Sequence, residues 1–336
     1  MSGDGSPRSL GSTLREGGGP PPTLEALLGR EDLRILPLQR NTRSLLEDLP
    51  ALGTADYTTR NASVTCTRRE AVRTVLASGE GTSLFGDSDG MRWLDESWRH
   101  SVAVLSCGED FTDMPPCLLF FGGAGDLAHQ VTLPDPAAWE AFIALVRRHH
   151  GCWNCLRHQA VLPEPGAAAD CPVWMLREAW CDASSERDLE VRLVGLGLDH
   201  LLALRALEGL YTTPIAARDL ASLLKGLAPS ALPVHVQLGN RHCTQVLESP
   251  MESLTFGPHG WEIRMAHATL RLDPSRMDSI WSVAQPVPGG ERHRAECYDA
   301  AGERVLTLSS PHDPCPLVYL GWQRHLGHLE EGQFSA

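Results

Sequence analysis

The stretch that decides the fold runs from Trp261 to Ser310 and reads WEIRMAHATLRLDPSRMDSIWSVAQPVPGGERHRAECYDAAGERVLTLSS. A fainter copy of it runs from about Leu84 to Val131. In both copies an arginine, Arg92 or Arg271, is followed ten residues later by an apolar strand, and then by a second strand-like run and a turn. The shared order of landmarks indicates that one unit occurs twice.

The spacing between the two copies is almost constant. The two arginines lie 179 residues apart, as do Asn61 and Asn240 farther upstream. The glycines of the two turns, Gly125 and Gly302, lie 177 residues apart. A period this long indicates a duplicated domain, because the repeats of solenoid proteins are only roughly 20 to 50 residues long.

The composition fits a chain of about two domains. Of its 336 residues, 42% are apolar, which is enough for two cores. The formal charge of -13 argues against a general nucleic-acid surface, since phosphate binding needs clustered Lys and Arg. No Ser-His-Asp order or paired-carboxylate pattern supports hydrolase chemistry.

The cysteines are expected to be reduced. Ten of them would suit a secreted disulfide framework, but the segment MSGDGSPRSLGSTLREGGGPPP has no apolar core of the kind that a signal peptide needs. No apolar run approaches the roughly 20 residues that would span a membrane. We therefore expect a cytoplasmic protein without a membrane span.

Composition and periodicity divide the chain into four parts. Residues 1–22, rich in Gly, Ser and Pro, are expected to form a disordered tail. The segment 151–173, with PEPGAAAD at its centre, is expected to be a linker. The N-terminal repeat would then occupy 23–150 and the C-terminal repeat 174–330.

Apolar periodicity predicts an α+β fold in each repeat. The predicted helices lie at or within 23–53, 68–77, 135–150, 175–194, 198–207, 217–227 and 320–329. Strand-like alternation occupies most of 56–66, 91–133 and 234–308. Strands that follow strands, with helices gathered at the ends, imply a tandem duplication in which each repeat is an antiparallel sheet with flanking helices.

Two patterns suggest ligands. The segment HHGCWNCLRH, residues 149–158, contains a C-x-x-C pair, Cys152 and Cys155, which puts two thiolates within reach of one metal ion or of each other. A second ligand pair at zinc-finger spacing is missing, so an inert linker is the alternative. The equivalent arginines Arg92 and Arg271 lie on strands with one inward face, where a ligand carboxylate or an internal salt bridge would pair with them.

The dispersed landmarks resemble a known family. The segments GMRWLDESWRHSVAV and LLFFGGAGDLAHQVTL resemble the first repeat of the haemin-degrading and haem-trafficking proteins of the HemS/ChuS type. Residues 237–240, 281–283 and 298–302 resemble the second repeat, and the resemblance covers about Thr23 to Leu329. It implies two similar α+β repeats that bind haem in a cleft between helices of the second half and a sheet, with basic groups on the propionates. Arg92 matches the family's arginine at the propionate side.

The chain departs from the family at the iron ligand. The family's axial histidine comes about seven residues after the tryptophan matched by Trp180, where this chain has Arg187 or, with one inserted residue, Asp188. His200 matches a family arginine that faces the haem, so it is the nearest replacement ligand; a hydrogen-bonded histidine at a helix contact is the alternative. His312, which matches another family arginine, is a further candidate.

Two functions follow from the resemblance. The first is haem uptake and utilisation, by haem trafficking or by haemin degradation, in which iron, oxygen and an external electron donor supply the chemistry. The missing histidine favours binding over turnover. The implied partners are haem, a haem oxygenase and a haem ABC importer. The alternative is a non-catalytic paralogue that lost haem and acts as a partner-binding or regulatory module.

Overall fold

The structure is a computed structural model that describes residues 22–39, 42–78, 81–86, 90–93, 98–106, 115–152, 171–258, 260–287, 290–311 and 316–331. The predicted tail and most of the predicted linker lie outside these residues. The domain boundaries drawn from composition therefore stay predictions. No helix in the described ranges is long and apolar enough to cross a membrane.

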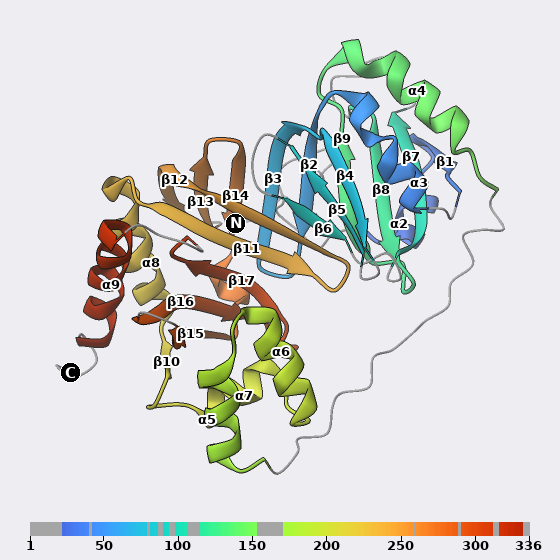
Figure 1. Cartoon of the computed structure of the whole chain (residues 1–336). Coiled ribbons are helices and arrows are strands. Elements are labelled where there is room, and N and C mark those ends of the chain that lie inside the picture. Colours follow the sequence, from blue (N-terminus) through green and yellow to red (C-terminus); the bar gives the residue numbers. More distant parts are fainter. Residues whose placement is uncertain are drawn as a thin grey trace, which may run out of the picture.

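Helices and strands occur in both halves of the chain (Figure 1). The helices are α2 (Leu24–Leu28), α3 (Thr42–Glu47), α4 (Trp139–Arg148), α5 (Val173–Asp182), α6 (Glu186–Gly195), α7 (His200–Ala206), α8 (Ala217–Leu227) and α9 (Pro316–Glu331). The strands of the first half are β1 (Leu33–Pro37), β2 (Thr54–Arg60), β3 (Val64–Ala71), β4 (Thr74–Ser78), β5 (Gly81–Phe85), β6 (Met91–Trp93), β7 (Trp98–Ser106), β8 (Cys117–Gly122) and β9 (Leu127–Thr132). Those of the second half are β10 (Thr212–Ile215), β11 (Pro233–Asn240), β12 (Cys243–Gly257), β13 (Gly260–Met265), β14 (Ala268–Leu272), β15 (Ser279–Val287), β16 (Gly290–Tyr298) and β17 (Arg304–Ser309).

The strands form two antiparallel sheets joined by the long strand β12. The first sheet runs β1, β7, β8, β9, β2, β3, β14, β13, β12. The second runs β4, β5, β6, β12, β11, β17, β16, β15, β10. Residues 243–250 of β12 pair with β11, and residues 251–257 pair with β13, so β12 belongs to both. The predicted antiparallel α+β class is confirmed.

Each repeat has a strand that pairs with a strand of the other repeat. Strand β6 of the first repeat pairs with β12 of the second, and β14 of the second pairs with β3 of the first. Arg92 lies opposite Thr244, and Arg271 lies opposite Thr65. The 179-residue offset that relates the arginines also relates the threonines. The duplication predicted from the sequence is therefore visible in the register of the strands.

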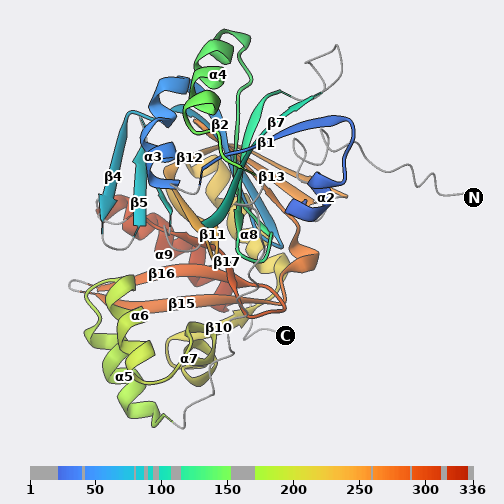
Figure 2. The ribbon, with the colours of Figure 1, turned by 90° about the vertical axis from the view of Figure 1, so that its right-hand side faces the viewer.

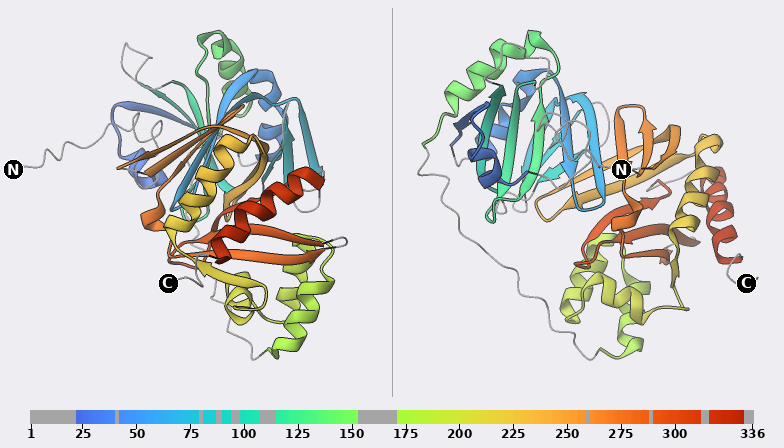
Figure 3. Two further views of the ribbon diagram at one scale, coloured as in Figure 1. Left: turned by 90° about the vertical axis from the view of Figure 1, so that its left-hand side faces the viewer. Right: turned by 180° about the vertical axis from the view of Figure 1, so that it is seen from behind.

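Helices cover the apolar face of the second sheet. Four leucines of α8, spaced three, one and three residues apart, lie on one side of the helix and pack on β11, β16 and β17: Leu220, Leu223, Leu224 and Leu227. Helix α9 packs beside α8, as the red and yellow helices of Figure 3 show. The opposite face of this sheet is covered at β15 and β16 by α5, α6 and α7 (Figure 2).

Three helix predictions are wrong at least in part. Residues 68–77 lie mostly in strands β3 and β4, because β3 pairs with β2 and β14; Arg68 and Glu70 of β3 are buried and form an ion pair at 2.8 Å. The predicted helix 175–194 breaks between α5 and α6, where Ser185 accepts a hydrogen bond from the Asp188 N–H at 3.1 Å and begins a new helix. The predicted helical segment 23–53 also contains strand β1, which pairs with β7.

Candidate functional site

One face of the second sheet is unusually polar. Residues directly opposite each other on antiparallel strands share a face. Arg92 lies opposite Thr244 of β12, and the pairing of β12 with β11 places Gln237 on the same face. Gln237 in turn lies opposite Thr307 of β17, which lies opposite Glu296 of β16. Arg92 of the first repeat and Glu296 of the second therefore share one face of one sheet.

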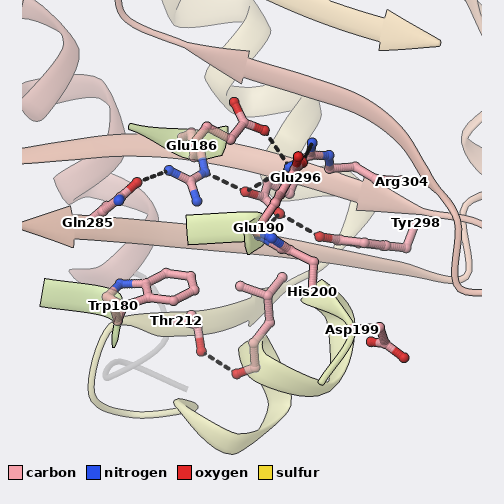
Figure 4. A network of polar contacts seen from close by, with 12 residues as sticks. Trp180, Glu186, Glu190, Asp199, His200, Thr212, Gln285, Glu296, Tyr298 and Arg304 are labelled. Atoms are coloured by element: carbon pink, nitrogen blue, oxygen red, sulfur yellow. Dashed lines mark hydrogen bonds and ion pairs between the residues drawn. The ribbon is translucent and has the colours of Figure 1, made fainter. Parts of the chain in front are cut away.

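A buried ionic network occupies this face beneath α5, α6 and α7 (Figure 4). Its centre is Glu296, whose side chain is 0% exposed. The carboxylate accepts a hydrogen bond from the Arg294 guanidinium and another from the Tyr298 hydroxyl at 2.5 Å. His200 Nε2 lies 3.2 Å from the same carboxylate. Three side chains thus converge on one buried anion.

The neighbours of Glu296 keep it ionised. Burial raises the pKa of this carboxyl, because removal from water disfavours the charged form. The charges of His200 and Arg294 outweigh burial and hold the pKa well below its usual value. Burial and the adjacent Glu296 charge also raise the pKa of the Tyr298 hydroxyl, so it remains a hydrogen-bond donor.

Arg304 of β17 ties helix α6 to the network. Its Nη1 lies 2.6 Å from the Glu186 carboxylate and its Nη2 lies 3.1 Å from that of Glu190. Nη1 also lies 3.9 Å from Glu296. Burial by itself would lower the pKa of the Arg304 guanidinium. The negative charges of Glu186 and Glu296 outweigh burial, so the pKa is raised above its usual value. Helix α6 is therefore held against the sheet by ion pairs as well as by apolar contacts.

The start of α7 directs His200 toward the sheet. Asp199 caps this helix by accepting a hydrogen bond from the Leu202 N–H at 2.7 Å. The His200 ring packs against Trp180 of α5 with 6.0 Å between centroids, and its side chain is 13% exposed. Arg294 lies over the same tryptophan ring at 5.8 Å. The candidate ligand His200 is thus enclosed by α5, α7 and β16.

Several buried polar atoms near this face lack a hydrogen-bond partner among the described residues. They include Arg294 Nη2, Gln285 Nε2, Trp281 Nε1, Thr307 Oγ1 and both ring nitrogens of His200. Most can donate a hydrogen bond, and buried polar groups are rarely left unpaired. The set is suited to a ligand that brings oxygen acceptors.

The first repeat has no such network at the equivalent positions. Where the second repeat has Arg294, Glu296 and Tyr298, the first has Cys117, Leu119 and Phe121, at an offset of 177 residues. These three side chains pack into an apolar cluster with α2 and β7. Because the same strands fold with apolar side chains in one repeat, the fold alone does not require buried charges in the other.

The structure separates the two equivalent arginines. Arg92 is half-buried on β6, on the face that carries the network. Arg271 lies on the first sheet, is exposed, and has its Nε 3.1 Å from the Glu262 carboxylate. Arg92 and His200 are therefore brought onto one sheet face, and Arg271 is not. His312 lies outside the described residues.

The other sequence candidates lie away from this face or outside the structure. Cys152 is exposed, and Cys155 is outside the described residues. His149 forms a contact of 2.6 Å with Asp48. In the part of the chain that the structure describes, no group of three or more His, Cys, Asp or Glu side chains has the arrangement of a metal site.

The family's axial position falls on the first turn of α6. Asp188 accepts a hydrogen bond from the Ser184 N–H at 2.9 Å and pairs with Arg192 at 3.0 Å, so its carboxylate is engaged at the helix start. Arg187 is exposed.

The residues that could not be predicted from the sequence are those of the network. Their only signal was the run RHRAECY, in which alternate positions of one strand, Arg294, Glu296 and Tyr298, are all polar.

Comparisons with known proteins agree with this architecture. Residues 197–314 match the family described as "Haemin-degrading HemS.ChuX domain". None of the curated proteins matches the chain significantly. The solved structure of holo-PhuS, described as a heme-binding protein from Pseudomonas aeruginosa, aligns with a TM-score of 0.79 and 23% identity over 90% of this chain and 88% of that one. Its apo form aligns with a TM-score of 0.77 and 24% identity over 88% and 86%.

A second relative has the same fold. ChuS, described as an E. coli heme oxygenase, aligns with a TM-score of 0.76 and 17% identity over 89% of each chain. The likeness to PhuS and ChuS extends over both repeats, whereas the sequence match lies in the second. Residues 197–314 thus match the HemS.ChuX domain, and the duplicated α+β fold of the chain is similar to that of PhuS and ChuS.

Proposed function

We propose that this chain is a cytoplasmic haem-binding protein that takes up haem and passes it on. The observation that carries the proposal is the shared sheet face of Arg92 and the buried network around Glu296. The match to a haemin-degrading domain and the fold shared with a heme-binding protein support it. The partners we expect are a haem ABC importer as donor and a haem oxygenase as acceptor.

The residues of the polar face fit the chemistry of haem. Haem presents two carboxylates, and the unpartnered donors of Arg294, Gln285 and Thr307, with the Arg92 guanidinium on the same face, are groups that bind carboxylates. The unpartnered His200 Nδ1 is a ligand type that iron accepts. When bound, haem would supply the iron and redox chemistry, while these side chains bind and orient it.

The proposed roles differ between the candidates. Arg92 would hold a propionate, and His200 would provide the imidazole. Arg271 and His312 are further haem-binding candidates from the resemblance, but Arg271 is paired with Glu262 on the first sheet. We therefore expect Arg271 to matter less than Arg92.

We propose binding and transfer in preference to degradation. The first turn of α6 carries Glu186, Arg187 and Asp188 in place of a histidine, and Arg304 ties that turn to the sheet. The same observation favours the second candidate function, a paralogue that no longer binds haem and acts as a partner-binding or regulatory module.

A haemin titration separates the two functions. Adding haemin to the purified protein is expected to give a shifted, saturable Soret band, and adding ascorbate under air is expected to leave that band largely intact. A protein with Cys152→Ser and Cys155→Ser serves as control, because an exposed thiol also binds haemin. An unshifted band would contradict the proposal and support the haem-free alternative. Loss of the band with ascorbate would instead assign degradation.

A further inference from the structure

We propose that Glu296 is a positioning residue that holds the His200 imidazole as the iron ligand and makes the site favour ferric over ferrous haem. This inference rests on the proposed function and deepens it.

Glu296 faces one side of the imidazole. His200 Nε2 lies 3.2 Å from its carboxylate, an ion-pair contact, and neither Nε2 nor Nδ1 forms a hydrogen bond with a described residue. Glu296 itself is held by Tyr298 at 2.5 Å and by Arg294, so the carboxylate is not free to follow the ring. Histidines that bind metals usually donate their second ring N–H to a carboxylate, a carbonyl or water, which fixes the tautomer and the orientation of the ring.

Glu296 is not explained by the needs of the fold. Its equivalent in the first repeat is Leu119, buried in an apolar cluster in the same strand arrangement. A buried carboxylate must be compensated, and here the compensation comes from Arg294, Arg304 and His200 together. Of these, His200 is the group with an unpartnered nitrogen of a type that binds iron.

The charge of Glu296 has a consequence for the oxidation state. A carboxylate hydrogen-bonded to an imidazole makes the ring a stronger electron donor, and stronger donation stabilises ferric iron relative to ferrous iron. Arg294 and Arg304 offset part of this charge, so the effect is smaller than for an isolated carboxylate. Since oxidative opening of haem requires reduced iron, a site that favours the ferric state suits storage and transfer.

Two variants and one control test the inference in the haemin-loaded protein. His200→Gln is expected to change the Soret and visible bands, and Glu296→Gln is expected to move the reduction potential to a more positive value while haemin still binds. Glu262→Gln is the matched control, because it removes a carboxylate of the first sheet that pairs with Arg264 and Arg271, outside the network around Glu296. Its potential is expected to lie close to that of the unaltered protein.

A measurement on the haem-free protein tests the positioning step by itself. At a pH high enough for the His200 ring to be neutral, nitrogen NMR is expected to show its proton on Nε2, and Glu296→Gln is expected to abolish this preference. No preference in the unaltered protein would overturn the positioning role. If haemin binds but His200→Gln leaves its spectrum unchanged, the inference fails while the proposed function stands. If haemin does not bind at all, both fail.

Discussion

Asn61 and Asn240 tie the two repeats together by reciprocal hydrogen bonds. The side-chain nitrogen of Asn61 donates to the Gly239 carbonyl at 2.8 Å and to the Val305 carbonyl at 2.7 Å. Asn240 donates to the two equivalent carbonyls of the first repeat, both at 2.8 Å. The side-chain oxygen of each asparagine accepts two backbone N–H groups of its own turn.

Replacing either asparagine is expected to destabilise the whole molecule. Asn61→Ala or Asn240→Ala leaves two carbonyls and two N–H groups without their partners, and the loss should be about 2 to 4 kcal/mol. Urea unfolding measures it. Gln39→Ala, which removes one hydrogen bond of an exposed side chain to the His150 carbonyl, is the control and should change stability little. Equal effects of the asparagine and control variants would show that the ties are not important.

Introducing residues of the first repeat into the second should show which side chains of the network are needed for stability and which for haemin binding. Glu296→Leu copies the first repeat but leaves Arg294 buried without its partner, and is expected to cost about 3 to 5 kcal/mol. The triple change Arg294→Cys, Glu296→Leu, Tyr298→Phe removes the three polar side chains of β16 together, leaves Arg304 paired with Glu186 and Glu190, and should cost less than the single change. Chemical denaturation with a parallel haemin titration checks both: the triple variant should fold but bind haemin poorly. Full haemin binding by a folded triple variant would contradict the assignment of this face.

The network should make stability depend on pH in the acid range. Glu296 has a pKa below its ordinary value of 4.5 in the folded protein, so the unfolded chain binds a proton more readily than the folded chain does. Its contribution is therefore complete above about pH 4.5, and it is lost as the pH falls through the folded-state pKa. Denaturation curves at several pH values should show a steeper acid loss in the unaltered protein than in Glu296→Gln. Parallel curves would contradict this role of Glu296.

The sequence predicted the fold through spacing. Constant offsets between Arg92 and Arg271, and between Asn61 and Asn240, require the same register in both repeats, and the strand pairings have it. Local patterns were less reliable where tertiary contacts override them. The segment 68–77 was predicted to be helical, but β3 pairs with β2 and β14, and Arg68 and Glu70 are buried in the sheet.

The site was only partly predictable. Arg92 was found through the repeat and the family resemblance, and His200 through the resemblance; the structure brings both to one sheet face. The network around Glu296 was missed because its members come from α6, α7, β16 and β17 and meet only in three dimensions. No local pattern reveals that Arg304 contacts two carboxylates of a helix more than 100 residues earlier in the chain.

The most direct test of the proposed haem site compares the two equivalent arginines. Haemin affinity is measured from the Soret band for the unaltered protein, Arg92→Ala and Arg271→Ala, with unfolding curves to confirm that all three fold. Loss of a charge-assisted contact at Arg92 should weaken binding about tenfold or more, which corresponds to at least about 1.4 kcal/mol. Arg271→Ala should bind as the unaltered protein does. Equal affinities of the two variants, or a greater loss for Arg271→Ala, would contradict a haem site on the face shared by Arg92 and Glu296.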